Sequence, residues 1–164
     1  MERLVTVAKI IESLGPVKGE KTLQKLIYLI DSNGCRLGYQ FDWQQYGPIS
    51  FQLQDDIHEI CALGLISITY DNKIPVYRSP RSLNHLREFW RNKHKNFVPQ
   101  TGLIHLLRFF QQLGEKRNNP KFLEILASMD YSNQYNQSGY TTTIETDDNL
   151  QIMARNSLDI LHHE

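Results

Sequence analysis

A run of leucine and isoleucine between residues 21 and 34 constrains the fold more than any other part of the sequence. Its large apolar side chains recur at i, i+3, i+4 and i+7, the spacing of one face of an α-helix: Leu23, Leu26, Ile27 and Ile30. Asn33-Gly34 follows, and such a pair commonly ends a helix. The run therefore predicts a core helix whose apolar face is covered by the elements around it.

Patterns on either side of this helix predict two further helices and a short strand. Before it comes a helical stripe that Gly15-Pro16 ends: Leu4, Ala8, Ile11 and Leu14. After it, apolar and polar residues alternate from Tyr39 to Gln44, which is typical of a short strand. Gly47-Pro48 predicts a sharp turn, with the proline in the first turn of a third helix. The predicted buried face of that helix consists of Phe51, Leu53, Ile57, Ile60 and Cys61.

The segment after Gly64 is typical of a β-hairpin. Two β-branched runs, residues 65–70 and 74–79, flank the turn residues Asp71-Asn72-Lys73. Pro75 has no N–H to donate to a ladder, so we expect its strand at an edge. Three helices followed by a hairpin is the order of a winged helix-turn-helix. The predicted fold class is mainly α with a small β-hairpin: a winged helix-turn-helix core plus additional C-terminal helices.

The second half of the chain is predicted to be helical with one interruption. Leu83, Leu86 and Trp90 mark one helix, Thr101 opens a second, and Asn119-Pro120 opens a third. Residues 131–143 lack apolar periodicity and predict a flexible polar linker. Asp148 is expected to open a final helix with a narrow apolar stripe formed by Leu150, Ala154, Leu158 and Leu161.

This pattern divides the chain into three expected parts. Residues 1–80 form the winged-helix domain, residues 81–130 a helical extension packed on it, and residues 131–164 the linker and C-terminal helix. A single helix with so narrow a stripe is unstable in water. We therefore expect it to dock on its own domain, on a dimer mate or on an external partner.

The charges are balanced overall but unevenly distributed. The chain has 18 basic and 18 acidic residues. Residues 73–95 hold seven basic residues against one acidic residue, a net charge of +6, and residues 141–164 hold five acidic against one basic, a net charge of −4. This distribution is consistent with binding to a polyanion, and equally with the acidic tail folding back on the basic middle.

Composition and catalytic patterns exclude several classes of protein. No apolar stretch approaches the roughly 18 residues of a membrane span, and no secretory signal is visible. Cys35 and Cys61 suit neither a disulfide framework nor a zinc site, so we expect reduced thiols, a cytoplasmic location and no membrane partner. Asp55, Asp56 and Glu59 could serve in acid–base catalysis, but no pocket signature accompanies them. We expect no catalytic residues, no metal site and no cofactor.

The candidate DNA contacts come from three places. The predicted outward residues of the third helix include three carboxylates and neither Lys nor Arg: Gln52, Gln54, Asp55, Asp56, His58 and Glu59. Carboxylates repel phosphates, so base reading by this helix is expected to be weak and confined to its amino end. The candidate contacts are therefore Ser50, Gln52 and Gln54 there, Lys18, Lys21 and Lys25 around the second helix, and Lys73, Arg78 and Arg81 on and beyond the hairpin.

Three ordered motifs in the first half carry a resemblance. They are K-x-L-Q-K-L-x-Y at residues 21–28, Y-G-P-I-S at 46–50, and L-G-L-I at 63–66 ahead of the hairpin. Together they resemble the YwgA-like family of small prokaryotic proteins and are similar to the winged-helix core of Panacea-type antitoxin domains. The resemblance covers roughly residues 1–80. It implies a winged-helix fold, a prokaryotic source and a regulatory or antitoxin-like role without catalytic residues.

Two functional hypotheses follow. The first is a winged-helix transcriptional regulator that binds duplex DNA, with the helical half building a homodimer. The second is a protein-interaction module, an antitoxin or adaptor that binds a protein such as a toxin and does not touch nucleic acid. The acidic third helix and the zero net charge motivate the second hypothesis.

Overall fold

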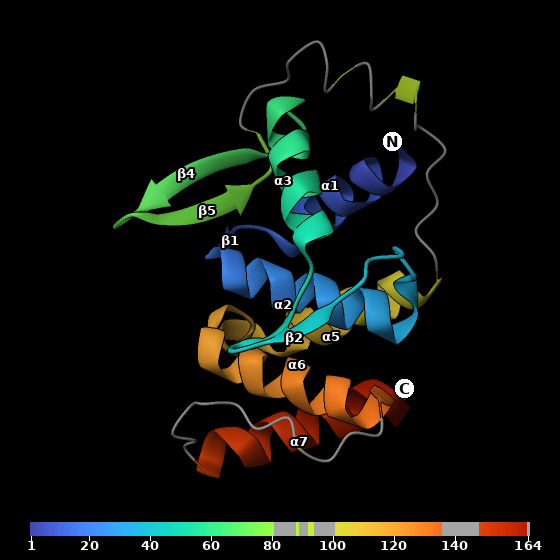
Figure 1. The fold of residues 1–164 in the computed structure, drawn as a ribbon, viewed down its shortest axis with the longest axis vertical. Coiled ribbons are helices and arrows are strands. Elements are labelled where there is room, and N and C mark those ends of the chain that lie inside the picture. Colours follow the sequence, from blue (N-terminus) through green and yellow to red (C-terminus); the bar gives the residue numbers. More distant parts are fainter. Residues whose placement is uncertain (81–87, 89–91, 94–100, 136–147, 164) are drawn as a thin grey trace.

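The computed structural model describes residues 1–80, 88, 92–93, 101–135 and 148–163. The described part of the chain is mainly α-helical, with small antiparallel sheets (Figure 1). The helices are α1 (Glu2–Leu14), α2 (Glu20–Ile30), α3 (Phe51–Ala62), α5 (Thr101–Gln112), α6 (Pro120–Tyr135) and α7 (Asp148–His163), with shorter helical turns η1 (Asp31–Cys35) and η2 (Gly114–Asn118). The strands are β1 (Val17–Lys18), β2 (Asp42–Gln44), β3 (Gly47–Ile49), β4 (Ser67–Asp71) and β5 (Ile74–Arg78). The helix predicted around Leu83, Leu86 and Trp90 falls outside the described residues.

Helix α2 lies at the centre of the molecule. α6 packs on α2, and α7 packs on the far side of α6, so the helices form successive layers (Figure 1). The predicted apolar stripe is confirmed, because its four side chains are almost completely buried: Leu23, Leu26, Ile27 and Ile30. Lys25, Tyr28 and Leu29 on the remaining faces are buried as well. From Thr22 to Ile30, α2 is therefore buried on every side, and not along one stripe only.

The predicted hairpin is confirmed as strands β4 and β5. Asn72 and Lys73 connect the strands with φ values of 48° and 67°, the left-handed pair of a two-residue type I′ turn. The expectation of an edge strand for Pro75 is wrong, because β5 lies between β1 and β4. In β5, only Val76 and Tyr77 pair with β1. The carbonyl oxygen of Pro75 accepts a hydrogen bond from the amide of Gly19, the residue that follows β1 (2.8 Å). The strand therefore needs no N–H from Pro75.

Gly47-Pro48 belongs to a strand, so the prediction of Pro48 in the first turn of the third helix is wrong. β3 pairs with β2, with Pro48 opposite Trp43. Ser50 follows and caps α3, its Oγ accepting a hydrogen bond from the Leu53 amide (3.3 Å). Gly47 has a φ of 91°, and a Cβ at this position would lie 3.0 Å from Ser128 Oγ of α6. A residue without a side chain is needed for β3 to approach α6 this closely.

The C-terminal helices follow the predicted pattern with one correction. Asn119 Oδ1 accepts hydrogen bonds from the amides of Lys121 (3.1 Å) and Phe122 (3.2 Å), which confirms the predicted cap of α6. The linker predicted for residues 131–143 is wrong at its start, because α6 continues to Tyr135. Tyr131 is buried, with its ring centroid 5.6 Å from that of Trp43. This long-range contact extends the helix beyond its apolar periodicity; residues 136–147 are not among those described.

Helix α7 docks on α6 of its own chain, one of the outcomes expected for the C-terminal helix. Ala154, Ser157 and Leu158 are buried in this contact. His162, near the end of α7, lies with its Nε2 2.9 Å from Oδ1 of Asp130, a completely buried carboxylate of α6. No helix in the described ranges is both long enough and apolar enough to cross a bilayer.

We expect Leu158→Ala to lower the free energy of unfolding by about 2–5 kcal/mol, because it leaves a cavity between α6 and α7. Ile104 on α5 is 41% exposed and serves as the matched control. Ile104→Ala should change the free energy of unfolding by no more than about 0.5 kcal/mol. Urea denaturation followed by circular dichroism measures both. Equal effects of the two substitutions would contradict the docking of α7 through Leu158.

Candidate functional site

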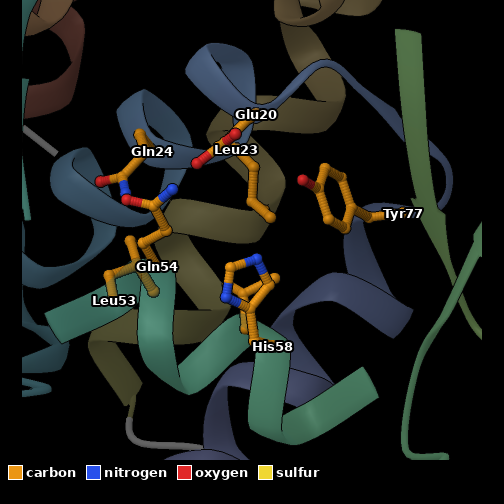
Figure 2. A pocket seen from close by; sticks show the side chains of 8 residues that line it. Glu20, Leu23, Gln24, Leu53, Gln54, His58 and Tyr77 are labelled. Atoms are coloured by element: carbon orange, nitrogen blue, oxygen red, sulfur yellow. The ribbon is translucent and has the colours of Figure 1, made fainter. Parts of the chain in front are cut away.

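A hollow with a cavity volume of about 380 Å³ opens where α2, the β2–β3 turn and α3 meet. We call it the α2–α3 hollow. Its lining combines carboxamides with two aromatic rings and one charge of each sign: Glu20, Lys21, Gln24, Gln44, Gln45, Tyr46, Ile49, Phe51 and Gln54. A smaller hollow of about 10 Å³ adjoins it through Glu20, Gln24 and Gln54. Figure 2 shows His58 and Tyr77 on the other side of this smaller hollow.

Gln24 joins α2 to the start of α3. Its Nε2 donates a hydrogen bond to the Ser50 carbonyl oxygen (2.9 Å), and its Oε1 accepts one from the Ser50 amide (3.1 Å). Both residues are buried, and Ser50 Oγ is already engaged as the cap of α3. Ser50, predicted as a DNA contact, therefore lies inside the protein. The pair holds the amino end of α3 at a set position on α2.

Lys25 is also inside the protein, on the side of α2 that α6 covers. Its side chain is 1% exposed, and its Nζ donates a hydrogen bond to the Pro48 carbonyl oxygen (2.9 Å). Burial lowers the pKa of Lys25 to about 8, and attraction to the Glu124 carboxylate of α6 offsets only part of that shift. Lys25 therefore ties α2 to β3 and is not on the surface that was expected to contact phosphates.

The acidic character of α3 is weaker than the sequence indicates. Asp56, predicted to face outward, is buried, and this prediction is wrong. Its Oδ2 accepts hydrogen bonds from Arg3 Nε of α1 (2.8 Å) and from the Tyr39 hydroxyl (2.7 Å). The guanidinium of Arg3 also lies 4.7 Å from the centre of the Tyr39 ring. Of the three carboxylates of α3, which is described in full, Asp55 and Glu59 are exposed.

The amino end of α3 presents an aromatic ring and amides. Phe51, predicted to be buried, is 62% exposed, so that prediction is wrong. Gln52 is exposed and Gln54 is half-buried at the α2–α3 hollow. A helix turns by about 100° per residue, so Phe51 lies roughly 200° from Leu53 and cannot share its face. This angle was the signal in the sequence that could have identified Phe51 as a surface residue.

The predicted basic contacts lie on two parts of the surface. Lys21 lines the α2–α3 hollow, with its Nζ 3.5 Å from the centre of the Tyr46 ring. Lys18 in β1 forms an exposed ion pair with Asp71 in β4 (2.6 Å). Lys73 is exposed in the β4–β5 turn, and Arg78 is half-buried at the end of β5. The structure thus brings Lys21 and Gln54 together and places the other three on the β1–β5–β4 sheet; Arg81 lies outside the described residues.

The geometry offers little for metal or thiol chemistry. Within the described ranges, no group of three or more His, Cys, Asp or Glu residues is arranged to hold a metal ion. Cys35 and Cys61 are free thiols, and burial raises the pKa of each to about 11. The glutamines at positions 44 and 45, with Tyr46, were missed as surface residues of interest. Only the packing of the β2–β3 turn beside α2 and α3 brings them to the hollow.

We expect Lys25 to make stability depend on pH. The folded-state pKa of about 8 lies below the ordinary value of 10.5, so between these values the unfolded chain binds more protons than the folded one. The free energy of unfolding should therefore rise with pH across this window, with a contribution of at most about 1.4 kcal/mol per pH unit.

Lys25→Met removes this contribution. The difference in the free energy of unfolding between the wild-type protein and the variant therefore separates the effect of Lys25 from that of the buried tyrosines. Burial raises the pKa of Tyr28 and Tyr39, which lowers stability at higher pH in both proteins alike. Urea denaturation at pH 7.5, 8.5 and 9.5 measures the effect. Parallel pH profiles for the two proteins would show that Lys25 does not titrate in this window.

A comparison with known proteins shows a similarity over part of the chain. No family model matches the chain. The chain is 32% identical over 65 residues to the uncharacterized protein YwgA of Bacillus subtilis (strain 168), a stretch that covers 40% of this chain and 39% of YwgA. The chain thus matches about two-fifths of that relative's length. The similarity supports a YwgA-like relationship over this stretch.

Proposed function

We propose that residues 1–80 form a winged helix-turn-helix. The order of elements supports this: α1, β1, α2 and α3 are followed by the β4–β5 hairpin, which we call the wing. β1 closes the sheet in the order β1–β5–β4. Residues 31–50 stand between α2 and α3, and they replace the usual short turn with η1 and the β2–β3 hairpin. The two-point hydrogen bond between Gln24 and Ser50 holds α2 and α3 together across this insertion.

On this scaffold we propose a non-catalytic regulator that binds duplex DNA. The observation that carries the proposal is the exposed amino end of α3, the helix that leads into the wing. In helix-turn-helix proteins the amino-terminal residues of the second helix of the motif contact base edges in the major groove. Phe51 and Gln52 hold this position and are exposed. Lys73 at the tip of the wing is free to approach a phosphate of the neighbouring backbone.

The distribution of charge supports an approach led by the wing. Affinity for DNA comes largely from phosphates neutralised by Lys and Arg. α3 contributes no cation, but the burial of Asp56 against Arg3 removes one of its three carboxylates from the surface. The segment 73–95, which starts in the wing, has a net charge of +6. The wing and the residues after it supply the phosphate contacts, and the first turn of α3 supplies the contacts to base edges.

A second candidate function is a protein-interaction module, antitoxin-like or adaptor-like, that binds no nucleic acid. The exposed rings of Phe51 and Tyr46 in the α2–α3 hollow favour it, because aromatic anchors in a concave surface are typical of protein interfaces. The resemblance to Panacea-type antitoxin domains favours it as well. Affinity capture from source lysate with and without nuclease separates the two functions. A stoichiometric protein that survives nuclease and is lost with Phe51→Ala would support this candidate.

We also propose that the helical half builds a homodimer. Ile152 and Ile160 are 59% and 47% exposed on α7, away from the side that packs on α6. A patch of this kind is a candidate contact between two copies of the chain. Light scattering on the wild-type protein and on Ile152→Glu tests it, and a monomeric wild-type protein would exclude the dimer.

We expect Lys73→Gln to weaken binding to every duplex and to lower the slope of log affinity against log salt by about 0.9, the value for one lost phosphate contact. Asp55→Asn should strengthen binding, since it removes an exposed carboxylate from α3. Fluorescence anisotropy from about 50 to 200 mM salt measures both effects.

Lys116→Gln, an exposed lysine in η2 of the helical half, is the matched control and should leave affinity unchanged. The absence of binding to any duplex at 50 mM salt would exclude the DNA-binding function. Equal losses with Lys73→Gln and Lys116→Gln would exclude the wing as the phosphate-contacting element.

A further inference from the structure

The exposed side chains at the start of α3 have a chemistry that distinguishes base pairs. In the major groove, guanine is best recognised by Arg or Lys, adenine by the carboxamide of Gln or Asn, and the methyl group of thymine by an apolar side chain. α3 contains neither Arg nor Lys. Its first turn presents the ring of Phe51 and the carboxamides of Gln52 and Gln54. The set therefore lacks the cationic donors that suit guanine, and it holds carboxamides that suit adenine and a ring that suits the thymine methyl group.

Phe51 and Gln54 are placed to act together. They are three residues apart on α3, so their side chains lie on one side of the helix, and both line the α2–α3 hollow. Gln52 is next to Phe51 on the outer side and is exposed. A ring and a carboxamide side by side match the thymine methyl group and the N6–N7 edge of adenine, which neighbour each other along the groove.

The supporting contacts keep this first turn in place. Ser50 caps α3 and is held to α2 by two hydrogen bonds from Gln24, of 2.9 and 3.1 Å. The carboxamide of Gln24 is fully used in this pair, so Gln24 is a positioning residue and does not read a base. Beyond the first turn, Asp55 and Glu59 are exposed and repel phosphates, which confines close approach to the amino end of α3.

We propose that Phe51, Gln52 and Gln54 give the protein a preference for A·T base pairs in the major groove. The carboxamides of Gln54 and Gln52 bind the N6 and N7 edge of adenine, and the ring of Phe51 packs on the thymine methyl group. This inference rests on the proposed DNA-binding function. The inference extends that function by naming the base pairs that are recognised and the residues that recognise them.

The test compares duplexes of equal length whose central pairs are all A·T or all G·C, in fluorescence anisotropy at about 50 mM salt. We expect the A·T duplex to bind about tenfold or more tightly, the discrimination of one good bidentate pair. Two chemical substitutions keep the minor groove unchanged. Uracil in place of thymine removes the methyl group, and 7-deazaadenine in place of adenine removes the N7 acceptor. Each should reduce the preference several-fold.

Variants assign the preference to residues. Phe51→Ala should abolish the effect of uracil, and the double variant Gln52→Ala/Gln54→Ala should abolish the effect of 7-deazaadenine. Gln112→Ala, an exposed glutamine at the end of α5, is the matched control and should change nothing. Thermal unfolding verifies that the two variants remain folded.

The outcomes separate this inference from the proposed function. Binding without preference, a preference for G·C, or a preference for A·T that survives both base substitutions would overturn base reading by α3 and leave DNA binding standing. No binding to any duplex at low salt would overturn the proposed function and the base preference with it.

Discussion

The packing of α6 on α2 is the contact on which the rest of the structure depends. α2 supplies Leu26, Ile27 and Ile30 to the core, and α6, which packs on α2, supplies Phe122 and Leu126 to the same core. A helix surrounded in this way is a core helix, and α6, β1 and β3 pack directly on it. α7 then covers the outer side of α6, so the C-terminal residues contribute to the same core as the amino-terminal ones.

Polar groups buried in this core act as joints between elements. Gln24 joins α2 to α3, Lys25 joins α2 to β3, and Arg3 joins α1 to Asp56 of α3. Further along α2, the buried carboxylate of Asp130 in α6 accepts hydrogen bonds from the Tyr28 hydroxyl and the Ser32 hydroxyl, each at 2.9 Å. Buried polar groups are costly unless they are paired, so each joint favours one arrangement of its elements over its alternatives.

These joints also decide which residues remain available for binding. Lys25, Ser50 and Asp56 are used inside the protein, whereas Phe51 and Gln52 are left on the surface. The face that results is less acidic and more aromatic than the sequence of α3 indicates. This change supports the proposed contact with DNA through the first turn of α3 and the wing. It also accounts for the second candidate function, since a ring beside a hollow suits a protein partner equally well.

The sequence by itself determined the local elements: the core stripe of α2, the β4–β5 hairpin and the Asn119 cap of α6. Periodicity and turn chemistry act between residues close in the chain, so a pattern is sufficient to predict them. Only the tertiary structure decided that Lys25 and Asp56 are buried, that Pro75 lies in a central strand and that α6 extends through Tyr131. Each of these depends on a partner far away in the sequence, such as Arg3 for Asp56 or Trp43 for Tyr131. A local sequence pattern does not show which distant element will cover a given face of a helix. For this reason the exposed face of α3 was predicted only in part.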